Sequence, residues 1–163
     1  MGDDGKQIPF AKERVAGLIA DLQKAGTKVI VPTPALAEIM VRAGVEAGQQ
    51  YIKLMGSAGV FRICPFDVRA AIETALMQGH ALSGEASKSA TTATRAKLKY
   101  DRQIVAIAKT EGAGIFYTDD TDQRAFAEKQ GLTVRGLTDL PVPTEAAQPT
   151  LFSLAGVNDE DEG

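Results

Sequence analysis

The chain has 163 residues, of which 44% are hydrophobic and 24% are charged, the balance of an ordinary soluble globular domain. This length supports one domain with a substantial core but not two comfortable ones. The formal net charge is −3, and the four acids of residues 159–162 account for all of this negative charge. The overall charge therefore neither indicates nor excludes nucleic-acid binding.

The scarcity of cysteine and histidine limits the chemistry that the chain can support. The single cysteine, Cys64, excludes an internal disulfide, and it reads as a small core residue at the end of an apolar strand. With His80 as the one histidine, a zinc cluster of cysteines and histidines is excluded too. Any metal must therefore be held mainly by oxygen.

The sequence carries no sign of a membrane or export signal. No apolar run approaches the roughly 18 residues needed to span a bilayer. The amino terminus also lacks the basic-then-apolar order of a signal peptide. We therefore expect a cytoplasmic protein without a membrane partner.

The first elements in chain order are a helix from Pro9 to Gly26 and a fully buried strand, Thr27–Val31. In the proline-rich stretch that follows, Thr33 is expected to cap a helix and Pro34 to occupy its first position. Glu38 lies one turn into this helix. Spacing leaves open whether it faces the core or is an exposed glutamate favoured by the helix dipole.

The same design is repeated further along the chain. Gln49–Met55 is helical or irregular, and Val60–Cys64 predicts a second strand. Asp67 then predicts the N-cap of a helix over Val68–Gln78. Residues 78–89 are rich in glycine and serine and predict a loop.

A long helix, Thr91–Lys109, carries a carboxylate in the middle of its apolar stripe. Asp101 shares the stripe with apolar residues at helical spacing, which is a costly position for a charge. Gly112 to Gly114 end this helix, and Ile115–Tyr117 predicts a short buried strand that stops at the acidic run Thr118–Asp122. The carboxyl ends of parallel strands are where α/β proteins usually bind ligands.

Basic residues gather around Asp101. Lys97, Lys99 and Arg102 are interrupted by no acid except Asp101 itself. They are either a solvated helix face or a rim that contacts phosphates beside an acidic site.

The last elements are a helix over Asp122–Gln130, with Ala125 and Phe126 turned inward, and a short strand, Leu132–Arg135. A turn follows at Leu137–Leu140. Helices that alternate with buried strands predict an α/β fold, with three α/β/α layers and a parallel sheet of about four short strands.

The domain is expected to cover residues 1–143, and residues 144–163 are read as a mobile acidic tail. Within that tail Leu151, Phe152 and Leu154 form an apolar exception. They are able to dock on the domain or on a second subunit.

Clustered carboxylates can hold magnesium or manganese ions that polarise a phosphodiester and generate hydroxide near neutral pH. Such a site needs acids that converge from different elements. The candidates here are Glu38, Asp101 and Asp120, with Asp119 or Asp122 as further members.

Three motifs together resemble the PIN domain family, which includes the VapC-type toxins of bacterial toxin-antitoxin pairs. These are ALAE, ending at Glu38, YDRQIVAIA, containing Asp101, and TDDTD over Thr118–Asp122. The similarity covers roughly Phe10 to Pro141 and lies in order and spacing. It implies a metal-dependent endoribonuclease with Mg²⁺ or Mn²⁺, an RNA substrate, an antitoxin partner and a homodimer.

The resemblance also implies roles for single residues. Glu38, Asp101 and Asp120 match the catalytic, metal-holding acids of the family, and Asp122 matches a more variable metal ligand. Thr118 matches the hydroxyl residue that orients the turn. Lys97, Lys99 and Arg102 are then expected to bind RNA.

One departure from the family pattern is large. Family members begin with an apolar strand that carries an aspartate and lies in the middle of the sheet, whereas Asp3 and Asp4 are flanked by glycine. The sequence therefore indicates either a start codon upstream of Met1 or a truncated, inactive form. We favour the upstream start, because a sheet without its central strand leaves backbone groups unpaired.

Other readings remain open at this point. Asp120 is also placed to cap the following helix, and Asp101 to pair with Lys97 one turn earlier. A PIN-like scaffold without catalysis would be an RNA- or protein-binding module. A receiver-like domain with an acidic magnesium pocket is a third reading, but no lysine follows a late strand as that reading requires.

Overall fold

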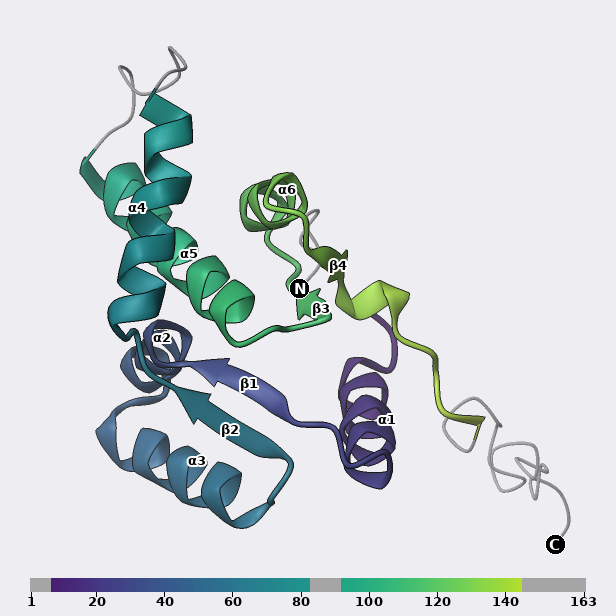
Figure 1. The fold of residues 1–163 in the computed structure, drawn as a ribbon. Helices are drawn as coiled ribbons and strands as arrows, with labels where there is room; N and C mark the ends of the chain where they lie inside the picture. Colours follow the sequence, from purple (N-terminus) through teal and green to yellow (C-terminus); the bar gives the residue numbers. More distant parts are fainter. Residues whose placement is uncertain (1–6, 83–91, 145–163) are drawn as a thin grey trace, which may run out of the picture.

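The computed structural model describes residues 7–82 and 92–144, which form a mixed α/β fold (Figure 1). Within these residues no helix combines the length and apolarity needed to cross a bilayer. The elements, in chain order, are α1 (Ala11–Lys24), β1 (Val29–Pro32), α2 (Thr33–Ala43), α3 (Val45–Ser57), β2 (Phe61–Cys64), α4 (Val68–Leu82), α5 (Thr92–Thr110), β3 (Ile115–Tyr117), α6 (Thr121–Lys129), β4 (Thr133–Arg135) and the 3₁₀ turn η2 (Leu137–Asp139).

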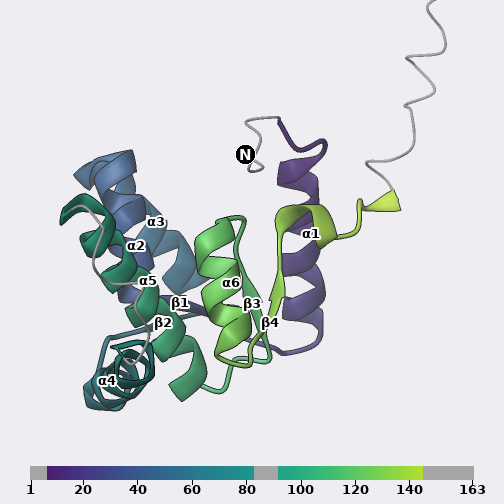
Figure 2. The ribbon, with the colours of Figure 1, turned by 90° about the horizontal axis from the view of Figure 1, so that it is seen from above.

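All four predicted strands are present, but they form two separate parallel pairs. β1 pairs with β2, in a register that aligns Val29 with Phe61, and β3 pairs with β4, which aligns Ile115 with Thr133. Figures 1 and 2 show the β1–β2 pair beside α2 and α3, whereas β3 and β4 lie between α6 and α1. A single sheet across all four strands is not formed in the part of the chain that the structure describes.

The core is centred on α5, because its apolar stripe meets elements from both strand pairs. Residues 104–108 are buried one after another, and Val105 and Ile107 are almost completely enclosed. α4 packs along α5, and Phe116 of β3 and Cys64 of β2 belong to the same buried cluster. α5 therefore holds together two strand pairs that do not share a sheet.

Two sequence predictions in the first half of the chain need correction. The first strand is half-buried along its length and not fully buried, because only one of its edges has a partner strand among the described residues. Thr33 does not cap α2. Its hydroxyl oxygen accepts a hydrogen bond from the Phe66 backbone N–H at 3.2 Å, and Pro32 occupies the N-cap position.

Two further predictions were wrong in the second half. The loop predicted over residues 78–89 begins later, since α4 continues to Leu82, and residues 83–89 lie outside the described residues. Buried Met77 anchors the last turns of α4. On α6, Ala125 is exposed and Ala127 is the fully buried alanine, because the helix begins at Thr121 and presents a different face to the core.

Candidate acidic site

Asp101 is the buried acid that the sequence pattern predicts. Its side chain lies on α5 with only 8% of the residue exposed. The Gln123 side-chain amide donates a hydrogen bond to Oδ1 at 3.2 Å, whereas Oδ2 is buried and has no hydrogen-bond partner among the described residues. Burial raises the pKa of Asp101, because a carboxylate loses its hydration there.

Charges on α5 itself, on α2 and at the start of α6 act on Asp101. The Lys97 ammonium lowers the pKa of Asp101, whereas Asp120, Glu38 and Asp122 each raise it, in that order of strength. The acids that the sequence singled out therefore face one region of the molecule. In residues 7–82 and 92–144, however, no three acids or other metal-binding side chains lie close enough to form a ready-made metal site.

Asp120 makes two contacts that fix its carboxylate. One oxygen accepts a hydrogen bond from the Gln123 backbone N–H at 2.9 Å and so caps α6. The other lies 2.6 Å from the Lys97 ammonium nitrogen. The hydrogen bond from Lys97, followed by the one from the Gln123 backbone, lowers the pKa of Asp120. The capping role considered for Asp120 is thus observed, whereas Lys97 forms its ion pair with Asp120 and not with Asp101.

Thr118 and Gln123 organise the turn after β3. The Thr118 hydroxyl oxygen accepts a hydrogen bond from the Asp120 backbone N–H at 3.1 Å, which fixes the backbone between these two residues. The Thr118 hydroxyl also donates to the Gln123 side-chain oxygen at 2.7 Å. Gln123 thereby links the turn to Asp101. Sequence reasoning missed Gln123, because a glutamine in the first turn of a helix carries no distinctive signal.

The remaining candidate acids differ in their surroundings. Asp119 accepts a hydrogen bond from the Leu137 backbone N–H at 2.7 Å, so it ties the turn after β3 to η2. Asp122 is exposed in the first turn of α6, where the helix dipole favours an acid. Glu38 is exposed on α2, which matches the surface alternative, yet it also borders a cavity.

Of the predicted RNA-binding residues, two are engaged within the fold. Lys97 is paired with Asp120, and the Arg102 guanidinium lies over the Phe126 ring, 5.9 Å from its centre. Lys99 is exposed. A guanidinium over an aromatic ring is a cation–π contact, so Arg102 has a partner within the fold.

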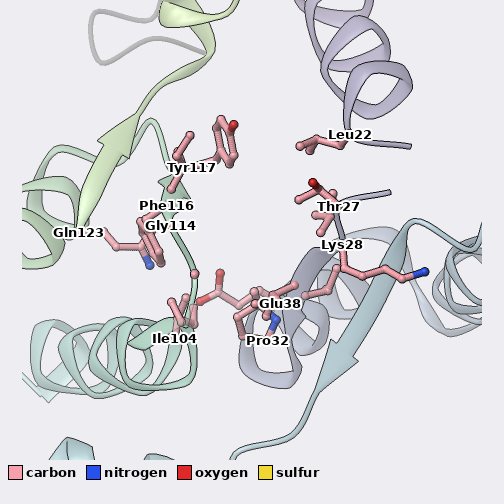
Figure 3. Close-up of a pocket in the computed structure, with 17 residues that line it drawn as sticks. Leu22, Thr27, Lys28, Pro32, Glu38, Ile104, Gly114, Phe116, Tyr117 and Gln123 are labelled. Atoms are coloured by element: carbon pink, nitrogen blue, oxygen red, sulfur yellow. The ribbon is translucent and has the colours of Figure 1, made fainter. Parts of the chain in front are cut away.

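A cavity of about 530 Å³ opens beside the acids, between β1 and β3. Figure 3 shows Phe116 and Tyr117 on one side of it and Leu22 and Thr27 on the other. Its lining is mainly apolar, and Glu38 and Gln123 are polar members that also act on Asp101. The residue patterns did not predict this apolar lining, although the missing central strand of the family had indicated unpaired backbone groups in the sheet.

Cys64 is buried, and burial raises the pKa of its thiol, so it is a core residue as predicted and not an activated nucleophile.

Comparisons with known proteins do not identify a family for this chain. No family model matches the sequence, and no curated protein matches it.

Proposed function

We propose that the protein is a PIN-like endoribonuclease that hydrolyses RNA phosphodiesters with Mg²⁺ or Mn²⁺ held by Asp101 and Asp120. Glu38 and Asp122 are the additional acids of this proposed site. The proposal includes a PIN-like arrangement in which the two strand pairs belong to one parallel sheet with helices on both faces.

The observation that carries the proposal is the buried, unpartnered Oδ2 of Asp101. A lone carboxylate oxygen without a donor is unfavourable in a protein interior, and a bound ion is one of the causes that account for such an exception. Three further acids face the same region and disfavour its ionised form. A divalent cation would reverse that balance by stabilising every carboxylate around it.

The candidate ligand atoms have the chemistry that a hard cation requires, but their positions in the structure do not form a coordination site. All candidate ligands are oxygen atoms, which magnesium and manganese prefer. Lys97 occupies one oxygen of Asp120, and no three acids converge among residues 7–82 and 92–144. Cation binding therefore requires Lys97 to leave Asp120 and Glu38 to turn toward Asp101. Both side chains are long and exposed enough to do so.

When bound, the cation would polarise the scissile phosphate and supply hydroxide near neutral pH. The chain's own residues have simpler tasks. Asp101 and Asp120 hold the site on two different elements, and Gln123 and Thr118 fix their orientation. Lys99, Arg102 and a released Lys97 would contact the RNA backbone through charge.

A binding module without catalysis is the second candidate. It is favoured by the Lys97–Asp120 ion pair, which neutralises an acid as a cation would, and by the absence of three converging acids in the described chain. Such a module would bind RNA or a protein without turnover.

A metal titration combined with a cleavage assay separates the two candidates. We expect Mg²⁺ or Mn²⁺ to raise the thermal unfolding temperature, because a ligand that binds only the folded state stabilises it, by about 2.7 kcal/mol at a hundredfold excess over Kd. We also expect the protein to cleave single-stranded RNA only with the metal. Asp101→Asn should abolish both effects.

Glu128→Gln is the matched control, because Glu128 is an exposed acid on α6 that forms a long ion pair of 3.9 Å with Arg124. This variant should keep both the metal response and the cleavage. RNA binding without cleavage at any metal concentration would favour the binding module. Cleavage that survives chelation of divalent ions would contradict the proposed site.

A further inference from the structure

The outer face of α4 is apolar and uncovered, although the inner face of the same helix is buried. Val68, Ile72 and Leu76 are 75%, 58% and 57% exposed, and their four-residue spacing places them in one stripe along the helix. Ala71 and Ala75 are exposed members of this α4 stripe. Figure 2 shows α4 at the edge of the molecule, with α5 on its inner side. A helix that is apolar on both faces is normally covered on both.

The charged side chains of α4 border the α4 stripe but are paired toward the end of α5. Over residues 68–78 the helix carries two charges. Arg69 lies 2.5 Å from Glu111, just beyond the end of α5, and Glu73 forms an ion pair with Lys109 of α5. The α4 stripe itself is therefore uncharged over more than two turns, whereas the outer face of a surface helix usually carries charged and polar residues.

We infer that the α4 stripe binds the same stripe of a second copy of the chain, with the two helices antiparallel. The spacing of the stripe is symmetric about Ile72, since Val68 and Leu76 lie four residues to either side of it. A two-fold axis at Ile72 therefore places Val68 of one copy against Leu76 of the other, which is the arrangement of an isologous contact. Ala71 and Ala75 are small enough to let the two helices approach closely.

The charges beside the α4 stripe favour a second copy over other partners. In the antiparallel pairing Arg69 of one copy lies level with Ala75 of the other. Glu73 likewise lies level with Ala71, so like charges do not meet. RNA or an anionic membrane surface would need free basic side chains around the stripe, but Arg69 is already bonded to Glu111.

The length of the α4 stripe sets the strength of the contact. Three large side chains over about 13 Å of helix bury less than the roughly 800 Å² per partner of a standard stable interface. The dimer should therefore be weak, with a dissociation constant of about 10 to 100 µM. The family resemblance implies a homodimer without indicating its surface. The exposure and spacing of the α4 stripe indicate one.

Sedimentation velocity of the full chain, from micromolar to near-millimolar concentration, tests this inference. The wild type should pass from monomer to dimer as its concentration rises. Ile72→Glu places two carboxylates against each other at the axis, so it should stay monomeric throughout. Leu54→Glu on α3 is the matched control, because Leu54 is 62% exposed and receives the same charge. It should dimerise as the wild type does. Both variants should unfold at the wild-type temperature at low concentration, because each changes an exposed side chain.

Cysteine cross-linking tests the direction of the two helices. The natural cysteine, Cys64, is buried, so a cysteine added to the α4 stripe supplies an accessible thiol. Ile72→Cys should form a disulfide-linked dimer when the thiols are oxidised by diamide, because a disulfide requires Cα atoms within about 7 Å. Val68→Cys and Leu76→Cys should each link poorly alone and efficiently when the two proteins are mixed.

A wild-type protein that stays monomeric at near-millimolar concentration would overturn the inference. Ile72→Glu that dimerises as strongly as the wild type would overturn it too, because association would then use another surface. Stronger linking of Val68→Cys alone than in the mixture with Leu76→Cys would contradict the antiparallel arrangement. None of these measurements uses metal or RNA, so their outcome does not depend on the proposed nuclease activity.

Discussion

The Lys97 ammonium nitrogen lies 2.6 Å from Oδ2 of Asp120, so a base on α5 is bonded to the acid that caps α6. This ion pair occupies the position where the resemblance to nucleases expects a cation. About half of the Lys97 side chain and about a third of the Asp120 side chain remain exposed to solvent. Lys97 is therefore a partly exposed positive charge that also acts on the buried Asp101.

Replacement of Lys97 by methionine tests this relationship. The pair is exposed, so its loss should change the free energy of unfolding by less than about 1 kcal/mol. The pKa of Asp120 should rise toward its ordinary value, because the largest cause of its depression is gone. The acids would then attract divalent cations more strongly, and the stabilisation by Mg²⁺ in urea unfolding should increase. Lys99→Met, on the same helix, is the control. A weaker Mg²⁺ response in Lys97→Met would show that the lysine assists metal binding.

Two substitutions of Asp120 separate its structural role from its proposed chemical role. Asp120→Ala removes both the helix cap and the carboxylate, and it should cost about 0.5–2 kcal/mol of stability. Asp120→Ser keeps an oxygen that can cap α6 and should be close to the wild type in urea unfolding. Both should lose metal-dependent stabilisation. If Asp120→Ser retains the full Mg²⁺ response, the carboxylate is not a ligand.

Gln123 can be tested through its two side-chain contacts. Gln123→Met keeps the length of the side chain but removes the hydrogen bonds to Asp101 and Thr118. Both oxygens of Asp101 would then lack donors, which should cost about 1–3 kcal/mol in urea unfolding at neutral pH. Gln103→Met, a partly exposed glutamine on α5, should have a much smaller effect. Equal losses in the two variants would mean that the bonds of Gln123 contribute little.

The sequence predicted local structure well, because local structure depends on neighbouring residues. The helix over 91–109 and the strand over 115–117 were confirmed almost to the residue. The cap of α4 was confirmed as well, since Asp67 accepts a hydrogen bond from the Ala70 backbone N–H at 2.9 Å. The buried position of Asp101 followed from its place in an apolar stripe.

Pairing and side-chain contacts were not predictable in the same way. Periodicity identifies the faces of a strand but not which edges meet, so one parallel sheet was expected where the structure has two strand pairs. Thr33 was expected to cap its own helix, and its actual donor, Phe66, lies 33 residues later in the chain. The link from Gln123 to Asp101 likewise depends on the packing of α6 against α5, which no local pattern encodes.

The buried carboxylate of Asp101 should be detectable in how the free energy of unfolding depends on pH. Burial raises the pKa of Asp101 in the folded state above its ordinary value of 3.8. The folded protein therefore binds more protons at this residue than the unfolded chain between the two pKa values, and stability falls as pH rises through that window. Asp101→Asn has no charge to desolvate, so it should lack this decline.

In urea unfolding without divalent ions, Asp101→Asn should therefore be close to the wild type near pH 4 and more stable, by about 1 kcal/mol or more, near pH 7. Asp120 acts with the opposite sign. Its lowered pKa contributes stability above pH 3.8 that is lost as pH falls toward its folded pKa, so Asp120→Ala should lose stability relative to the wild type at neutral pH, where Asp101→Asn gains it. Saturating Mg²⁺ should remove the advantage of Asp101→Asn, because the cation stabilises the carboxylate that the variant lacks. An Asp101→Asn protein that is less stable than the wild type near pH 7 without metal would show that the carboxylate is already compensated within the fold, and the case for a cation at this position would fail.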